Sequence, residues 1–433
     1  MKHTSSTRNR KALSASFASA VAVSLLLGGC GSGDDADEAA AENTGQEETP
    51  HGYVEGAEET AEQQSRLVLA DGDTGAVHVL DLITEEVVEV PEARQDGGVD
   101  GIGGDGRFAY LTPAEAGAPV QAVDSGAWMV DHGDHVHYYR ADIRATGTLV
   151  GDTDARPVSV HSDTAVTAVT FDDGTVTLLD RAQLEAGSVS PAGPGTLDLG
   201  SPHRGTAVPY AQHLLVTVPR QGQDLADAVA VRTRDGAEVA TLGEPCPELH
   251  GTVVTRHGVV FGCADGALLV AEDPENEGTF TAEKIPYPGS DEADRAWEFS
   301  HRPGSAVLAA PAGERGVWTL DVGAGEWTLF DTGPVVAANA VGDGLTLLTL
   351  TADGALHAYD TTSGEETAHA SLLAEPVAAS AAAPPVIEID SSRAYVNDAA
   401  ADTVYEIDYN DDLRVARTFP LDFTPTHMVE TGR

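Results

Sequence analysis

The most constraining feature of the sequence is a repeat of short strand-like segments, which come in groups of four after Arg66. Apolar and polar residues alternate within the segments, and turn sequences such as Asp173-Gly174 separate them. The groups recur with a period of roughly 35 to 55 residues. Two well-defined groups run from His203 to Leu242 and from His250 to Ala271. Other groups begin near Asp100, Val160, His301, Val335 and Val386.

Groups of four strands at this period predict an all-β fold, a single β-propeller spanning residues 66–433. The segment from Thr426 to Gly432 resembles a first strand with no group after it, whereas Arg66 to Ala70 resembles a second strand without a first. Pairing the two would close the ring with one shared blade. Counting that blade predicts eight blades, with seven as the alternative because residues 95–155 are ambiguous. A pair of β-sandwiches is the competing architecture.

The N-terminus has the features of an export signal. A basic stretch up to Lys11 precedes an apolar segment from Ala12 to Leu27, which is too short for a stable membrane span. The sequence Leu27-Gly28-Gly29-Cys30 resembles a bacterial lipobox. We therefore expect residues 1–30 to be a lipoprotein signal peptide, with Cys30 lipidated and the protein anchored to the outer face of the cell membrane. An ordinary cleaved signal peptide is the alternative.

The segment from residue 31 to 65 has acidic residues, no basic ones and almost no large apolar side chains. Such a segment cannot bury enough surface to fold alone, so we expect a disordered acidic tether. His51 is its only histidine. The segment is either a passive spacer or an arm that hands on a metal ion.

The whole chain is strongly acidic, with 70 Asp and Glu residues against 24 Lys and Arg residues and a formal charge of −46. This field repels phosphate backbones and attracts cations. Nucleic acid is therefore an unsuitable partner and a metal cation a suitable one, although an acidic surface can also serve solubility alone.

Five of the 15 histidines lie just before predicted innermost strands. In a propeller this position is at one end of the central channel, so we expect these side chains to converge on the axis. A repeated structural histidine would give the same pattern. The five are His161, His203, His250, His301 and His427.

The segment Asp131-His132-Gly133-Asp134-His135-Val136-His137 offers three imidazoles and two carboxylates within seven residues. His135 and His137 point the same way in an extended strand, and the turn at Gly133 brings His132 or Asp134 toward them. Zinc takes about four nitrogen or oxygen ligands at roughly 2.0 to 2.2 Å. We expect this loop to supply two or three zinc ligands and channel histidines, especially His203 and His250, to supply the rest. A solvated polar loop is the alternative.

The sequence resembles the extracytoplasmic zinc chaperones that partner Azt-type ABC zinc importers. The features that carry this resemblance are the export signal, the repeat, the segment from Trp128 to Tyr139 and the element from Cys246 to Cys263. This resemblance covers most of residues 66–433. It implies a propeller that binds zinc and passes it to the importer's solute-binding protein. It also implies zinc roles for His132, Asp134, His135, His137 and His250. The lipobox departs from a freely diffusing periplasmic protein.

Cys246 and Cys263 are the two cysteines outside the lipobox. In an oxidising compartment two such cysteines form a disulfide, and thiolate metal ligation is the rival interpretation. The resemblance also implies the disulfide.

Catalysis has weaker support in the sequence. There is no Gly-x-Ser-x-Gly elbow, phosphate-binding loop or His-Glu-x-x-His pair. We expect a zinc-binding protein that is not an enzyme. A metal-dependent hydrolase or lactonase and a propeller that only binds other proteins are the alternatives.

Overall fold

The computed structural model describes residues 52–132, 135–151, 154–219, 225–289, 295–342, 346–378 and 381–433. The predicted signal peptide, Cys30 and His51 lie outside these residues, as does the tether up to residue 51. Residues Pro50–Arg433 form one compact unit. Among the described residues, no helix has the length and apolar character needed to cross a membrane.

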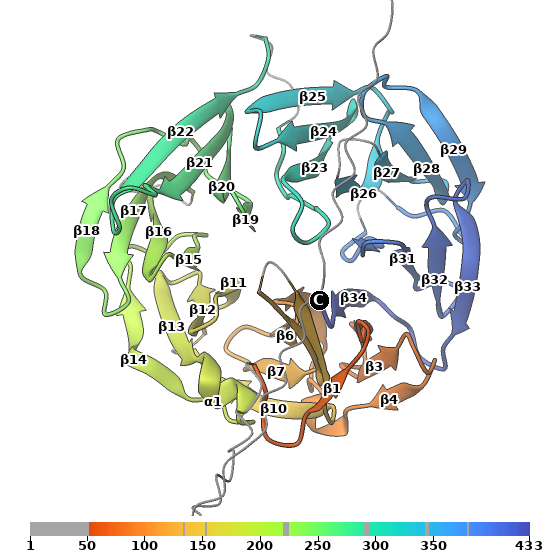
Figure 1. Ribbon diagram of the computed structural model, residues 1–433, viewed down its shortest axis with the longest axis horizontal. Coiled ribbons are helices and arrows are strands. Elements are labelled where there is room, and N and C mark those ends of the chain that lie inside the picture. Colours follow the sequence, from red (N-terminus) through yellow and green to blue (C-terminus); the bar gives the residue numbers. More distant parts are fainter. Residues whose placement is uncertain are drawn as a thin grey trace, which may run out of the picture. The chain divides into compact units, whose positions relative to one another are not determined.

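The unit is built almost entirely from antiparallel sheets that follow one another around a ring (Figure 1). The described residues contain eight sheets of the repeating kind, seven with four strands and one with three. The prediction of an all-β propeller is confirmed.

The strands of the first four sheets, in order of pairing, are β34 (His427–Thr431), β2 (Arg66–Ala70), β3 (Val77–Asp81) and β4 (Val87–Glu89); β5 (Val99–Gly104), β6 (Phe108–Pro113), β7 (Val120–Asp124) and β10 (Arg144–Leu149); β11 (Pro157–Ser162), β12 (Val166–Phe171), β13 (Thr175–Asp180) and β14 (Pro191–Asp198); and β15 (Ala207–Tyr210), β16 (His213–Pro219), β17 (Ala226–Thr233) and β18 (Glu238–Thr241).

The strands of the other four sheets are β19 (Thr252–Thr255), β20 (Gly258–Cys263), β21 (Gly266–Glu272) and β22 (Phe280–Pro286); β23 (Val307–Ala312), β24 (Gly316–Asp321) and β25 (Glu326–Phe330); β26 (Val335–Gly342), β27 (Thr346–Thr351), β28 (Ala355–Asp360) and β29 (Glu366–Ser371); and β30 (Ile387–Ile389), β31 (Ala394–Asp398), β32 (Thr403–Asp408) and β33 (Arg414–Pro420). A short helix α1 (Arg181–Glu185) follows β13, and a 3₁₀ turn η1 (Pro91–Ala93) follows β4.

Asp-Gly turns join neighbouring strands in several of the sheets. At the turn between β12 and β13, Gly174 has φ +86°, a backbone conformation that favours glycine, and Asp173 Oδ1 accepts a hydrogen bond from the Thr175 amide at 2.9 Å. The turn at Gly354 repeats this arrangement with the same φ. The two turns show how the repeated sequence signal produces a repeated hairpin.

The core lies between neighbouring sheets. Several middle strands are buried along their whole length, among them β2 and β20. One apolar cluster joins Val260 and Ile285 of one sheet to Trp318 and Leu320 of the next. Each fully buried large apolar side chain stabilises the fold by about 1.5–3 kcal/mol, so these contacts between sheets hold the ring together.

Strands from both ends of the unit share one sheet. β34 pairs antiparallel with β2, with Ala70 opposite His427 and Arg66 opposite Thr431. β34 therefore occupies the first-strand position beside β2.

The sheet that contains β23 departs from the predicted pattern. A first strand was expected to start near His301, but the structure has only an isolated bridge between Ser300 and Ala309. Pro303 and Gly304 follow directly. Proline has no amide hydrogen to donate to a ladder, which explains why pairing stops there.

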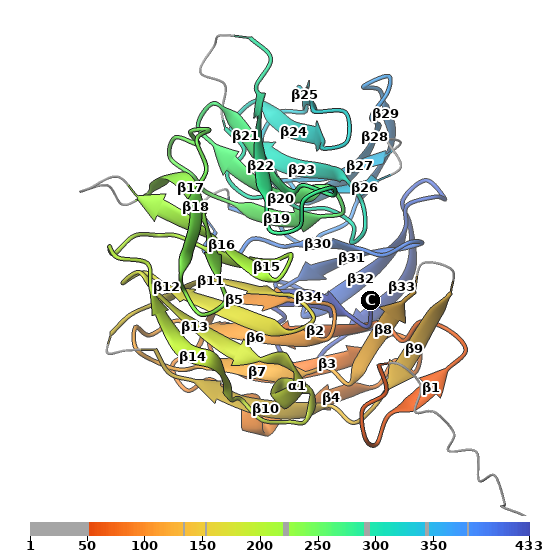
Figure 2. The ribbon, with the colours of Figure 1, turned by 60° about the vertical axis from the view of Figure 1, so that its left-hand side comes forward.

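An additional hairpin is inserted between β7 and β10. Its strands β8 (Ala127–Asp131) and β9 (Val136–Arg140) form a separate three-stranded sheet with β1 (Glu58–Thr60), and this sheet stands apart from the ring (Figure 2). The insertion explains why the repeat was ambiguous between residues 95 and 155.

The predicted tether is wrong at its C-terminal end, because β1 pairs with β9 and residues 64 and 65 are buried. The backbone of Gly52 also contacts the hairpin, since its carbonyl accepts a hydrogen bond from the Trp128 indole at 3.1 Å. Composition failed to predict this because β1 has few apolar residues of its own and gains its hydrogen bonds from β9.

Candidate metal centre

The tip of the inserted hairpin carries three histidines. His132 follows β8, His135 precedes β9, and His137 lies within β9. The ladder places Val130 opposite His137 and Trp128 opposite Tyr139, so alternate side chains of both strands project from one face. The backbone amide of His132 donates to the carbonyl of His135 at 2.9 Å and closes the turn. Register therefore brings the three imidazoles to one side of the hairpin.

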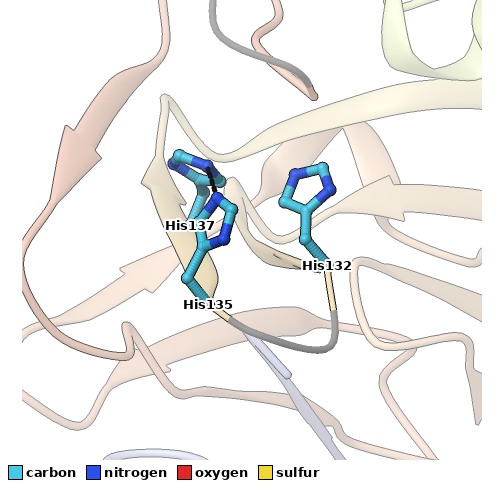
Figure 3. Close-up of side chains that lie close together, drawn as sticks. All are labelled: His132, His135 and His137. Atoms are coloured by element: carbon cyan, nitrogen blue, oxygen red, sulfur yellow. Dashed lines mark hydrogen bonds between the residues drawn. The ribbon is translucent and has the colours of Figure 1, made fainter.

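The three side chains form a compact group, which we call the histidine triad. One ligand nitrogen from each of His132, His135 and His137 lies within 4.8 Å of the other two. The Nε2 atoms of His135 and His137 are 3.1 Å apart. The ring of His132 faces them across the turn, 4.9 Å from His135 and 5.3 Å from His137 between ring centroids (Figure 3). His132 and His135 are exposed, and His137 is half-buried.

Glu59 of β1 fixes one member of the triad. Its Oε1 atom lies 2.7 Å from Nδ1 of His137. Glu59 is opposite Tyr139 in the ladder, and long side chains on one face can reach a diagonal neighbour two residues away. A carboxylate at Nδ1 holds the proton on that nitrogen and leaves Nε2 with its lone pair for a metal ion. β1 therefore contributes a metal-orienting residue to the hairpin.

This arrangement suits a transition-metal ion. Ligands about 2.1 Å from a tetrahedral zinc ion lie roughly 3.4 Å from one another, close to the observed 3.1 Å between the two Nε2 atoms. Neutral imidazole is a good ligand for zinc, copper and nickel. Among the described residues, three imidazoles supply three of the four usual zinc ligands, which leaves one position for water or an incoming donor.

Of the two carboxylates in the loop, only Asp131 belongs to the described residues. Asp134 lies outside the described residues, as does Gly133. Asp131 ends β8, opposite Val136.

His203, predicted to complete the site, has its ring nitrogens engaged elsewhere. Its Nδ1 lies 2.8 Å from the carbonyl of Ser201, and its Nε2 lies 3.0 Å from Thr217 Oγ1. The residue is only 3% exposed. These contacts correct the prediction, because they hold the side chain against its own sheet as a structural histidine.

His250 and His161 share a cavity of about 190 Å³ with Glu298 and Arg204. His250 Nδ1 lies 2.8 Å from the carbonyl of Trp297. Burial lowers the pKa of His161 to about 4, so this imidazole is neutral at pH 7. His250 and His161 thus line one cavity together, and none of its lining residues comes from the hairpin.

His427 and His301 occupy two further cavities. His427 lines one of about 890 Å³ together with Asp100 and Arg204, and its Nε2 lies 3.1 Å from the carbonyl of Val99. His301 lines another with Arg433. Burial, together with the positive charges of Arg433 and Arg302, lowers the pKa of His301 to about 4.

The hairpin and His427 lie at opposite ends of the inner strand β34. β34 begins at His427, whereas Arg433, two residues beyond its end, shares a cavity with Trp128 and Asp131 at the base of the hairpin. Gly106, just after β5, lines the same cavity. The expectation that channel histidines complete the loop's site is therefore wrong for the described residues, where the triad contains hairpin histidines alone.

Sequence reasoning missed Glu59. It lies 78 positions from His137 in a segment that was expected to be disordered. In the sequence, nothing distinguishes Glu59 from the nearby Glu58 and Glu62 as a partner of a histidine. The distinction comes from the pairing of β1 with β9, which places Glu59 next to His137.

Cys246 and Cys263 form a disulfide, as expected from their compartment and from the resemblance. Both cysteines are fully buried against the apolar residues of β20 and its neighbours. Thiolate ligation of a metal by this pair is thereby excluded in the disulfide form.

Comparisons of sequence and of structure both find similarity to a zinc chaperone. No family model matches the chain. The chain is 26% identical over 223 residues to the zinc chaperone AztD of Citrobacter koseri, a match that spans 48% of each protein. The matched region is thus about half the length of that relative.

Similarity of fold extends further than similarity of sequence. The crystal structure of Citrobacter koseri AztD matches with a TM-score of 0.72 and 19% identity, covering 86% of this chain and 98% of that one. Its apo structure matches with the same TM-score and coverage at 18% identity. The dihydro-heme d1 dehydrogenase NirN matches less well, with a TM-score of 0.51 and 17% identity over 85% of this chain and 75% of that one. By sequence over 48% of its length and by fold over most of it, this chain is similar to the zinc chaperone AztD.

Proposed function

We propose that this protein is an extracytoplasmic zinc chaperone, which captures zinc at the histidine triad and delivers it to the solute-binding component of an ABC zinc importer. The observation that carries the proposal is the convergence of three imidazoles within 4.8 Å, one of them held by Glu59. The similarity to AztD, a zinc chaperone, supports zinc as the cargo. The charge of −46 favours cation capture.

Zinc capture is tested on protein purified without a histidine tag. We expect at least one equivalent of zinc after loading and loss of the tightest site in His135→Ala and His137→Ala. His257→Ala is the matched control, because His257 is an exposed histidine in the turn between β19 and β20. Less than about half an equivalent in the wild-type protein would refute the proposal.

Capture also has a pH signature. Zinc and protons compete for the same imidazole nitrogens, so zinc affinity falls as the solution becomes more acidic. Calorimetric titrations at pH 7.5 and pH 5.5 should give a clearly weaker zinc affinity at the lower pH. Equal affinities would mean that imidazoles are not the ligands.

Delivery is tested with a purified zinc-specific solute-binding protein. We expect zinc to pass from the loaded chaperone faster than it dissociates into a dilute chelator, because direct transfer requires contact between the two proteins. Transfer at the rate of free dissociation would count against a dedicated partner. A loaded protein without ester or lactone hydrolysis would favour the chaperone over the hydrolase alternative.

Localisation follows from the lipobox. We propose that Cys30 is lipidated and holds the protein on the outer face of the membrane, with no other membrane contact. A Cys30→Ala variant should leave the membrane fraction, whereas equal retention of both proteins would refute the anchor.

A further inference from the structure

One edge of β8 is not paired with any strand. β8 is the last strand of the sheet β1–β9–β8, so only its edge toward β9 belongs to a ladder. At the tip of the hairpin, the amide of His132 donates to the carbonyl of His135. Bonded and non-bonded pairs alternate along an antiparallel ladder, so the pair Met129–Tyr138 is a non-bonded one. The N–H and C=O of Met129 therefore point away from β9.

The backbone of Met129 is available to another chain. Among the residues that the structure describes, no group bonds to its N–H or C=O. By contrast, the Ser125 hydroxyl caps Ala127, because it lies 3.4 Å from both the nitrogen and the carbonyl oxygen of that residue. Met129 is also 37% exposed. Proteins usually protect such an edge with lysine, proline or a bulge, and β8 has none of the three.

A groove of about 430 Å³ follows this edge, and we call it the β8 groove. Its volume is within the roughly 300–1,000 Å³ that is typical of ligand sites. One wall is β8, and the other consists of the turns after β5 and β11 together with α1, all from the ring (Figure 2). The four consecutive residues from Trp128 to Asp131 line the groove. Because successive side chains of a strand point to opposite faces, the groove runs along the edge of β8 rather than over one face.

The accessible charge of the β8 groove is negative. Its three arginines are largely buried, and each is paired with a carboxylate. These pairs are Arg107 with Asp124, Arg181 with Asp105, and Arg433 with Glu388. By contrast, Asp131 is exposed and the Glu185 side chain is 34% exposed. The formal charge of −46 on the whole chain acts in the same direction, so the segment that fits this groove is basic.

We propose that the β8 groove is the docking site for the zinc acceptor, and that an extended basic segment of the acceptor pairs with β8 as a fourth strand of the sheet. This inference rests on the proposed delivery of zinc to a partner protein. One residue of the segment exchanges two hydrogen bonds with Met129, and its basic side chains meet Asp131 and Glu185. Pairing at a sheet edge is a recurrent mode of peptide recognition.

Docking at this edge brings the acceptor to the histidine triad. His132 directly follows β8 and is three residues from Met129. A strand rises about 3.3 Å per residue, so this separation is about 10 Å. Acceptor side chains two to four residues beyond the one paired with Met129 then lie beside the triad. Because His132 and His135 are exposed, the same segment can recognise the chaperone and present an incoming zinc ligand.

Met129→Pro tests the pairing. Proline removes the N–H, and its ring occupies the space of a partner strand, yet no bond to β9 is lost because this N–H does not face β9. Val87→Pro is the matched control. Val87 lies on β4, the last strand of another sheet, and is also 37% exposed. By the same alternation, its N–H points away from β3.

The experiment mixes the zinc-loaded full chain with a purified, zinc-free, zinc-specific solute-binding protein in a stopped-flow instrument. Met129→Pro should slow zinc transfer at least tenfold, whereas Val87→Pro should leave the rate unchanged. Zinc titrations of both variants should give the wild-type affinity, because neither residue belongs to the triad. Transfer from the wild-type protein should also slow as salt increases, because salt screens the attraction between the basic segment and the groove.

Hydrogen exchange on the wild-type protein gives a second measurement, which does not depend on how well a proline variant folds. The acceptor should protect the amide of Met129. The neighbouring amides of Trp128 and Val130 should change little, because they already donate to β9.

Three results would overturn the proposal. Wild-type transfer at the rate of free dissociation would remove the docking site together with the proposed delivery. Direct transfer without protection of Met129 and without an effect of Met129→Pro would remove the docking site alone. Protection of Met129 that rises with the concentration of the chaperone, in the absence of acceptor, would mean that a second copy of this chain occupies the edge.

Discussion

Replacing Glu59 with alanine tests whether the N-terminal strand helps the triad to bind zinc. Glu59 is the partner of Nδ1 on His137, at 2.7 Å, and it reaches that atom from β1 rather than from the hairpin. Without the carboxylate, the imidazole loses its fixed ring orientation and its preferred tautomer. It must recover both when zinc binds.

The magnitude follows from the geometry. Loss of a carboxylate that orients a metal-bound histidine costs about 10- to 100-fold in metal affinity. The Glu59 side chain is 44% exposed and that of His137 is 24% exposed, so water partly screens the interaction. We therefore expect the lower limit, a loss of about tenfold, or about 1.4 kcal/mol. Glu59→Gln retains a neutral acceptor and should lose about threefold.

Glu58→Ala is the matched control. Glu58 precedes Glu59 in the same strand, and its carboxylate pairs with Arg140 at 3.1 Å instead of with a histidine. Competition with a chelator of known zinc affinity measures all three variants. Equal zinc affinities for Glu59→Ala and Glu58→Ala would refute the reasoning. A second measurement uses the coupling between zinc binding and the docking of β1. If docked β1 strengthens zinc binding, zinc must stabilise docked β1 by the same factor, so zinc should increase the hydrogen-exchange protection of residues 58–60.

Three further predictions concern stability. His203→Ala should cost about 1–3 kcal/mol of unfolding free energy because it leaves Thr217 without its partner, yet the zinc affinity of the triad should not change; a loss of zinc affinity would restore His203 to the site. Reducing the disulfide opens a loop with a sequence separation of 17 and should cost about 3 kcal/mol, measured as a lower Tm. The pKa of His301 is about 4 in the folded protein, against about 6.5 when unfolded, so the unfolded chain takes up this proton first. Stability should therefore fall between pH 6.5 and pH 4 by at most about 3 kcal/mol, and His301→Gln should reduce that fall.

Much of the fold could be predicted because a propeller repeats its local signals. Alternating strands recur in each sheet and Asp-Gly turns in several of them, so an ambiguous unit can be interpreted by comparison with the others. The two departures occur where the repeat is interrupted. Pro303 and Gly304 remove a first strand, and the hairpin β8–β9 adds two strands between β7 and β10.

The site was only half predictable from the sequence. The spacing of His135 and His137 was sufficient to place both on one face of a strand, and the tight turn added His132. The position of the hairpin relative to the channel was not encoded in that spacing. It depends on the insertion after β7, which forms a separate sheet with β1. The same dependence on long-range pairing hid Glu59.

The position of the triad also bears on how zinc would leave it. A closed site with four protein ligands must lose a ligand before zinc can move, whereas three imidazoles leave one coordination position accessible. His132 and His135 are exposed, so an incoming ligand can bind zinc before any imidazole departs.

Release should then depend on the acceptor. In stopped-flow experiments on the zinc-loaded protein, the rate of zinc loss should rise in proportion to chelator concentration, and Glu59→Ala should raise it further. A rate that stays constant as chelator increases would mean that zinc dissociates first. In that case direct transfer between proteins could not use the open position of the triad.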